Sequence, residues 1–114
     1  PSAITTIASI SGFPMDKFVF LGFPPHKKGR NKFFKEVAEH KYPVVIYESP
    51  YRILKTLREL DKMFQVSGFG FQVVVGRELT KKFETIYRGG IKDVITQLEK
   101  QKIKGEFVIV INKK

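Results

Sequence analysis

Two apolar runs in this sequence end abruptly in charged side chains. The run Val44–Tyr47 leads into Glu48 and Arg52, and the run Val73–Val75 leads shortly into Glu78. Short runs of β-branched residues bounded by turn residues are typical of buried strands, and open α/β sheets bind ligands just beyond the carboxyl ends of their strands. We therefore predict a polar ligand site there, with Glu78 as a candidate general base. A structural Glu48–Arg52 ion pair and a simple charged turn are the alternative interpretations.

A basic loop, Lys27-Lys28-Gly29-Arg30, precedes a predicted helix. Lysine offers point charges to phosphates, and arginine offers a planar fork. The whole chain has 21 Lys and Arg against 11 Asp and Glu, a net charge of +10, which favours a polyanionic partner such as RNA or DNA. A solvated loop on a lysine-rich surface is the alternative. We predict RNA contact.

Length and composition limit the classes of protein to which this chain can belong. A chain of 114 residues with 42% hydrophobic residues and eleven Phe fits one globular domain. No apolar run approaches the ~20 residues of a membrane span, and the absence of Cys favours a cytoplasmic protein. His26 and His40 have no partner at metal-ligand spacing, so no metal site is expected. The start at Pro1, without a basic leader, indicates part of a longer protein.

Apolar spacing predicts the elements that would position these residues. Helices are expected over 2–11, 31–41, 51–65 and 91–102, and strands over 18–23, 43–48, 71–77, 83–88 and 105–112. Their alternation predicts a single three-layer α/β domain with a mixed, mostly parallel sheet of about five strands. The short connection after Arg77 predicts at least one antiparallel pair.

Six segments occur in an order and spacing that resemble one known family. They are Pro1-Ser2-Ala3, Phe18–Pro25, Lys28-Gly29-Arg30, Tyr47–Arg52, Arg77–Lys81 and Lys104-Gly105-Glu106. Together they resemble the tetrapyrrole methylase superfamily, and most closely its branch that methylates a cytidine ribose 2′-hydroxyl in bacterial small-subunit rRNA. Tyr51, where the family usually has His, and Gly76, where it usually has Ala, depart from the pattern.

The resemblance implies that residues 1–114 form the carboxyl-terminal domain of a two-domain methyltransferase whose amino-terminal domain is absent from this chain. S-adenosylmethionine would be the cofactor, with its adenine held by main-chain groups at strand ends. We expect the chain alone to be inactive and the complete protein to be a homodimer. The implied cofactor-binding residues are Pro1, Ser2, Ala3, Tyr47, Glu48, Leu79 and Glu106.

Two other functions remain open on the sequence alone. A porphyrin- or corrin-ring methylase of the same superfamily is one, although a charge of +10 suits RNA better than an acidic macrocycle. A non-catalytic RNA-binding module, resembling a small ribosomal protein, is the other. For an enzyme acting on the small ribosomal subunit, the expected RNA-binding residues are Lys27, Lys28, Arg30, Arg52, Lys81 and Lys82.

Overall fold

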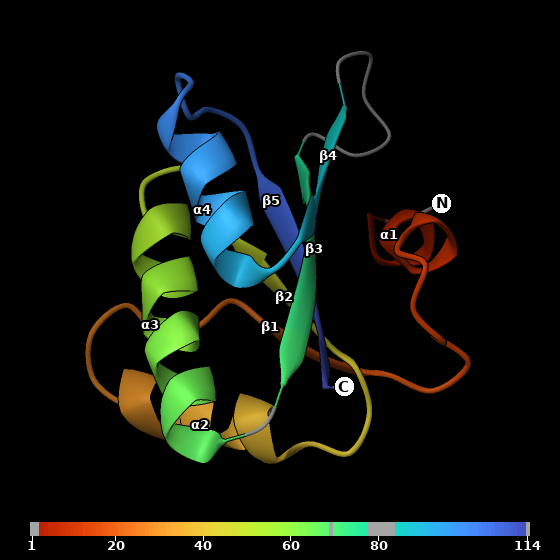
Figure 1. Cartoon of the computed structure of the whole chain (residues 1–114), viewed down its shortest axis with the longest axis vertical. Helices are drawn as coiled ribbons and strands as arrows, with labels where there is room; N and C mark the ends of the chain where they lie inside the picture. The colour runs from red at the N-terminus through yellow and green to blue at the C-terminus, as the bar shows by residue number, and fades with distance from the viewer. Residues whose placement is uncertain (1–2, 69, 78–83, 114) are drawn as a thin grey trace.

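The computed structural model describes residues 3–68, 70–77 and 84–113, and these form one α/β domain (Figure 1). Each predicted helix and strand is present. The helices are α1 (Ala3–Ile10), α2 (Arg30–Glu39), α3 (Ile53–Ser67) and α4 (Ile91–Glu99), and the strands are β1 (Val19–Gly22), β2 (Val44–Glu48), β3 (Phe71–Arg77), β4 (Thr85–Gly89) and β5 (Phe107–Lys113). None of the described helices is long and apolar enough to cross a membrane.

The sheet has five strands in the order β1-β2-β5-β3-β4. β1 and β2 pair in parallel, whereas β2–β5, β5–β3 and β3–β4 are antiparallel. The prediction of a mixed sheet is confirmed, but the prediction that it is mostly parallel is wrong. β2 and β3 do run in the same direction, and β5 inserts between them in the opposite one. Continuous apolar runs report burial on both faces and carry no information about that insertion.

Helices cover the two faces of the sheet unequally, as Figure 1 shows. The helices α2, α3 and α4 pack on one face, where Phe34, Leu57, Leu98 and Ile109 belong to the larger core cluster. On the other face, α1 is the helix that packs on the sheet within the described residues, with Ile7 in a smaller core cluster. The predicted three layers are therefore confirmed.

A side chain from the edge strand ties α1 to the sheet. Arg88 of β4 donates hydrogen bonds to the carbonyl oxygens of Ile10 and Ser11, the latter at 2.9 Å. These carbonyls lie at the carboxyl end of α1, where helices leave acceptors unpaired and favour a cation. The contact fixes the end of α1 against the antiparallel half of the sheet.

Glycines with positive φ set the bounds of two helices. Gly29 (φ 88°) immediately precedes α2, and Gly68 (φ 77°) ends α3 as its C-cap. Glycine adopts this left-handed region without the steric cost that other residues incur. Element bounds otherwise differ from the predictions by a few residues, the largest difference being the end of α4 at Glu99 rather than 102.

Candidate ligand-binding edge of the sheet

The strand register brings the predicted polar strand ends to one edge. Glu48, the last residue of β2, pairs with Phe107 of β5, and Phe107 also pairs with Arg77, the last residue of β3. Glu106 directly precedes Phe107 and is exposed. The carboxyl ends of β2 and β3 and the start of β5 therefore form one edge, with the end of the parallel strand β1 beside them. This is the place at which α/β sheets bind ligands.

The carboxylate of Glu48 is buried at this edge, with 1% of the residue exposed. Its Oε1 accepts a hydrogen bond from the Ser49 backbone N–H at 2.9 Å, and its Oε2 accepts one from the Thr56 hydroxyl at 2.6 Å. The Nε of Arg52 lies 3.4 Å from Oε1. A buried carboxylate is tolerated when it is paired and hydrogen-bonded in this way. The side chain of Glu48 therefore has a structural role, in holding the end of β2 against the start of α3.

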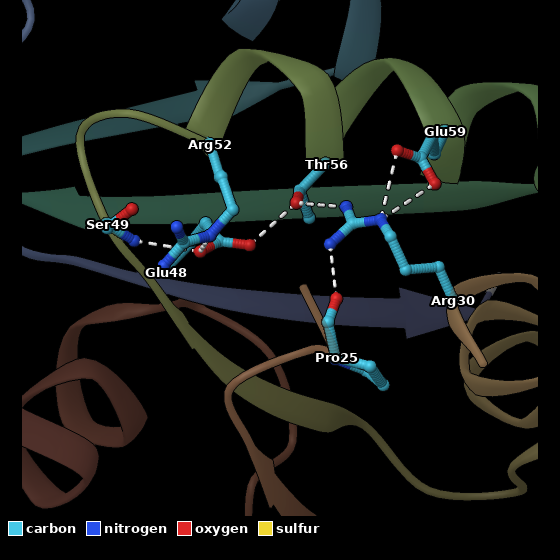
Figure 2. A network of polar contacts seen from close by, with 7 residues as sticks. All are labelled: Pro25, Arg30, Glu48, Ser49, Arg52, Thr56 and Glu59. Atoms are coloured by element: carbon cyan, nitrogen blue, oxygen red, sulfur yellow. Dashed lines mark hydrogen bonds and ion pairs between the residues drawn. The ribbon is translucent and has the colours of Figure 1, made fainter. Parts of the chain in front are cut away.

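Arg30 continues the same network from the other side (Figure 2). Its Nη2 donates to Thr56 Oγ1 at 2.9 Å, its Nε lies 3.2 Å from both carboxylate oxygens of Glu59, and its Nη1 donates to the Pro25 carbonyl oxygen at 2.6 Å. With only 6% of the residue exposed, this guanidinium binds protein acceptors. Because these acceptors occupy the guanidinium, the prediction that Arg30 binds an RNA phosphate is corrected.

The network joins three segments that leave or enter the edge. Glu48 ends β2, Thr56 and Glu59 lie on α3, and Pro25 lies in the loop between β1 and α2. Because Arg30 binds the Pro25 carbonyl, the basic loop is held at a defined place beside the strand ends. Arg30 is therefore a positioning residue for that loop.

Thr56 and Glu59 were not predicted from the sequence. Arg52, Thr56 and Glu59 are spaced four and three residues apart, so they share one side of a helix. That spacing after a strand-end glutamate is the signal that could have identified them. Their partner Arg30 is 26 and 29 residues away in sequence, and no local pattern indicates such a pairing.

Of the other predicted site residues, some lie in the described part of the chain and six lie outside it. Lys27 and Lys28 are exposed on the anchored loop, and Arg52 is half-buried beside Glu48. Tyr47, one residue from the end of β2, is also half-buried, and Ala3 is the first residue of α1. Six predicted residues lie outside the described residues: Pro1, Ser2, Glu78, Leu79, Lys81 and Lys82.

A groove lies away from this edge, between α2 and α3. It has a volume of about 560 Å³ and is lined by residues that include Phe34, Ala38, Met63 and Val66. These residues come from the length of α2 and the carboxyl-terminal half of α3, so the groove opens on the outer helical layer. The described residues contain no group of three or more His, Asp or Glu that could hold a metal ion.

Open α/β sheets bind ligands in the crevice beyond the carboxyl ends of their strands, and polar groups of this domain gather at that edge. Residues 1–95 match the family model described as Tetrapyrrole (Corrin/Porphyrin) Methylases. The chain belongs to this family.

Curated relatives share its sequence over nearly the full chain. Proteins named ribosomal RNA small subunit methyltransferase I are 37% identical in Thermotoga maritima, 40% in Helicobacter pylori strain J99 and 43% in Hydrogenobaculum sp.. The alignments cover 100%, 96% and 99% of this chain but 50%, 39% and 48% of those proteins. The chain therefore spans about half the length of these relatives, or less.

Solved structures share the fold at lower sequence identity. The methyltransferase CobJ superposes with a TM-score of 0.68 over 98% of this chain and 48% of its own, and the cobalt precorrin-4 methyltransferase CbiF with 0.63 over 93% and 48%. Both are 16% identical to this chain, so this likeness concerns the fold alone. It confirms the predicted α/β class.

Proposed function

We propose that this chain is the carboxyl-terminal half of an S-adenosylmethionine-dependent methyltransferase that acts on a cytidine ribose 2′-hydroxyl of small-subunit rRNA. The observation that carries the proposal is the identity of 37–43% to proteins named ribosomal RNA small subunit methyltransferase I, across nearly the whole chain. The complete protein would contain an amino-terminal domain, form a homodimer and work in the cytoplasm on the small ribosomal subunit.

The cofactor would lie against the strand edge and supply the methyl group. Adenine would be held by main-chain groups near Tyr47, Glu48 and Leu79, with Glu106 and the Pro1–Ala3 segment closing the pocket. The burial of the Glu48 carboxylate supports this arrangement. Since Ser49 N–H, Thr56 and Arg52 already occupy that carboxylate, Glu48 would contact the cofactor through its main chain.

The chain's contribution to the reaction would be mainly positioning. Transfer of a methyl group from a sulfonium to a ribose hydroxyl is a displacement, and holding the hydroxyl oxygen in line with the methyl group supplies much of the rate. The hydroxyl proton must leave, and we propose Glu78, directly after β3, as the base that accepts it. Two carboxylates of the edge would then differ in role, because Glu48 is already committed to the network.

RNA would approach over the basic loop. Lys27 and Lys28 are exposed and stand on a backbone that Arg30 fixes through Pro25, so their charges are available to phosphates with little loop ordering on binding. Arg52, Lys81 and Lys82 would extend this surface around the edge. Phosphate contacts of this kind provide affinity and register, whereas base contacts provide sequence selectivity.

The test is methyl transfer by the complete two-domain protein. It is incubated with small ribosomal subunits and S-adenosylmethionine carrying a deuterated methyl group, and the rRNA is digested to nucleosides for mass spectrometry. We expect label in 2′-O-methylcytidine. Label in a methylated base, or labelling of a corrin or porphyrin ring without labelling of rRNA, would overturn the proposal.

A further inference from the structure

Three aromatic rings gather at the carboxyl ends of β1 and β2. The rings of Phe20 and Tyr47 have centroids 5.0 Å apart at an interplanar angle of 67°, and those of Phe23 and Tyr47 are 5.6 Å apart at 63°. Both are edge-to-face arrangements, which hold aromatic rings in defined orientations. We call Phe20, Phe23 and Tyr47 the aromatic cluster.

Phe20 lies on β1, Phe23 directly follows that strand, and both Phe rings are largely outside the core. Phe20 is 43% exposed and Phe23 is 51% exposed, although Phe residues are normally among the most buried. Leu21, between them, packs on the larger core cluster beneath α2–α4. Tyr47 packs on the smaller cluster at the α1 face, so the aromatic cluster is on that face of the sheet.

Positive charge follows the aromatic cluster directly along the chain. Phe23 leads into the loop that carries Lys27 and Lys28, both exposed. The loop is anchored because Arg30 donates to the Pro25 carbonyl oxygen at 2.6 Å. Exposed aromatic rings followed in the chain by exposed cations form a combination that single-stranded nucleic acids bind, with bases on the rings and phosphates on the cations.

We propose that Phe20 and Phe23 form a platform on which bases of single-stranded RNA stack, while Lys27 and Lys28 hold the adjoining phosphates. The inference deepens the proposed function, since it rests on RNA as the substrate and says how its bases are held beside the strand edge. Tyr47 supports the platform by fixing the two Phe rings edge-on. A net charge of +10 favours this occupant over an apolar segment of another protein domain.

The experiment measures RNA binding by the 114-residue chain. A fluorescent single-stranded RNA of mixed sequence is compared, by anisotropy, with an abasic strand that has the same number of phosphates. Phe20→Leu and Phe23→Leu keep apolar volume but remove the aromatic face, and Phe20→Tyr keeps that face. Phe18→Leu is the matched control, because Phe18 is also exposed, at 37%, but lies outside the aromatic cluster.

Each Leu variant is expected to weaken binding of the base-bearing RNA by about 5- to 150-fold, the range for one lost base stack. Binding of the abasic strand and the dependence of affinity on salt should not change, because no phosphate contact is lost. Phe20→Tyr and Phe18→Leu should bind like the unmodified chain.

Several results would overturn the platform. These are the absence of RNA binding by the unmodified chain, equal losses on the abasic strand, and unchanged affinity in both Leu variants. If another domain covers the aromatic cluster, Phe20→Leu would lower the melting temperature of the complete protein but not of this chain, with RNA affinity unchanged. The methyl-transfer assay fails or succeeds independently of these arms, so failure of the platform and of the proposed function are distinguishable.

Discussion

The two faces of the sheet are built for different purposes. On the face beneath α2, α3 and α4, large apolar side chains such as Leu57, Leu60 and Phe107 are almost wholly buried. The other face has a smaller cluster around Ile7 and Val74 beneath α1, and its aromatic cluster at the ends of β1 and β2 is half exposed. One face thus holds most of the buried core, and the other leaves the two Phe rings of the aromatic cluster exposed.

The network of Glu48, Thr56 and Arg30 lies on the side of α3, where β2 ends. Its carboxylate, hydroxyl and guanidinium are buried under α3, yet the backbone that they hold is the end of β2 and the basic loop. These buried contacts therefore fix the backbone at the edge of the sheet where β2 ends. Variants at the two faces should consequently differ in what they damage.

The largest effect on stability is expected from Leu57→Ala. Leu57 is 0% exposed, and truncating such a side chain removes apolar contacts and leaves a cavity, which lowers the free energy of unfolding by about 2–5 kcal/mol. Urea unfolding followed by circular dichroism measures the change. Phe20→Leu on the other face is the comparison, with an expected change of about 0.5 kcal/mol or less, as at exposed sites. Equal losses would mean that the aromatic cluster belongs to the core.

A smaller loss is expected from Thr56→Val. Valine has nearly the shape of threonine, but the Glu48 carboxylate loses a buried donor and Arg30 loses an acceptor. An unsatisfied buried group costs about 1–3 kcal/mol, measured by the same urea unfolding. Thr56→Ser retains the hydroxyl and should recover most of that loss. If Val and Ser variants are equally stable, the hydrogen bonds contribute nothing and the network does not anchor the edge.

The smallest effect on stability is expected from the double variant Lys27→Gln and Lys28→Gln, because both residues are exposed. RNA affinity should nevertheless fall, and the slope of log affinity against log salt should decrease by about 0.7 for each lost contact to single-stranded RNA. The matched control is Lys100→Gln with Lys102→Gln, two exposed lysines after α4. If the two double variants have similar slopes, the basic loop contributes no more to RNA binding than other surface lysines do.

Most of the fold follows from local patterns, whereas the site depends on tertiary placement. Apolar spacing on α3 predicts one apolar face of Ile53, Leu54, Leu57, Leu60 and Phe64. The structure buries all of them except Leu54, which is partly buried and packs against the core. The insertion of β5 between β2 and β3 was not predictable in this way, because pairing partners far apart in sequence decide it.

Arg30 shows the same limit at a single residue. In sequence it belongs to a basic loop, and its chemistry suits a phosphate. Its burial arises from Thr56 and Glu59, which only the packing of α2 on α3 brings within reach. The Glu48–Arg52 pair, by contrast, was among the interpretations open from sequence, because both residues are local to one strand-to-helix turn.

Calorimetric titration of S-adenosylmethionine tests the central claim, that the strand edge is one wall of a cofactor site shared with a second domain. The complete two-domain protein should bind the cofactor, and the 114-residue chain should bind it weakly or undetectably. Losing the contacts of one wall costs on the order of a thousandfold in affinity for each ~4 kcal/mol. Sub-micromolar binding by the 114-residue chain would contradict the claim, because the pocket would then be complete within this domain.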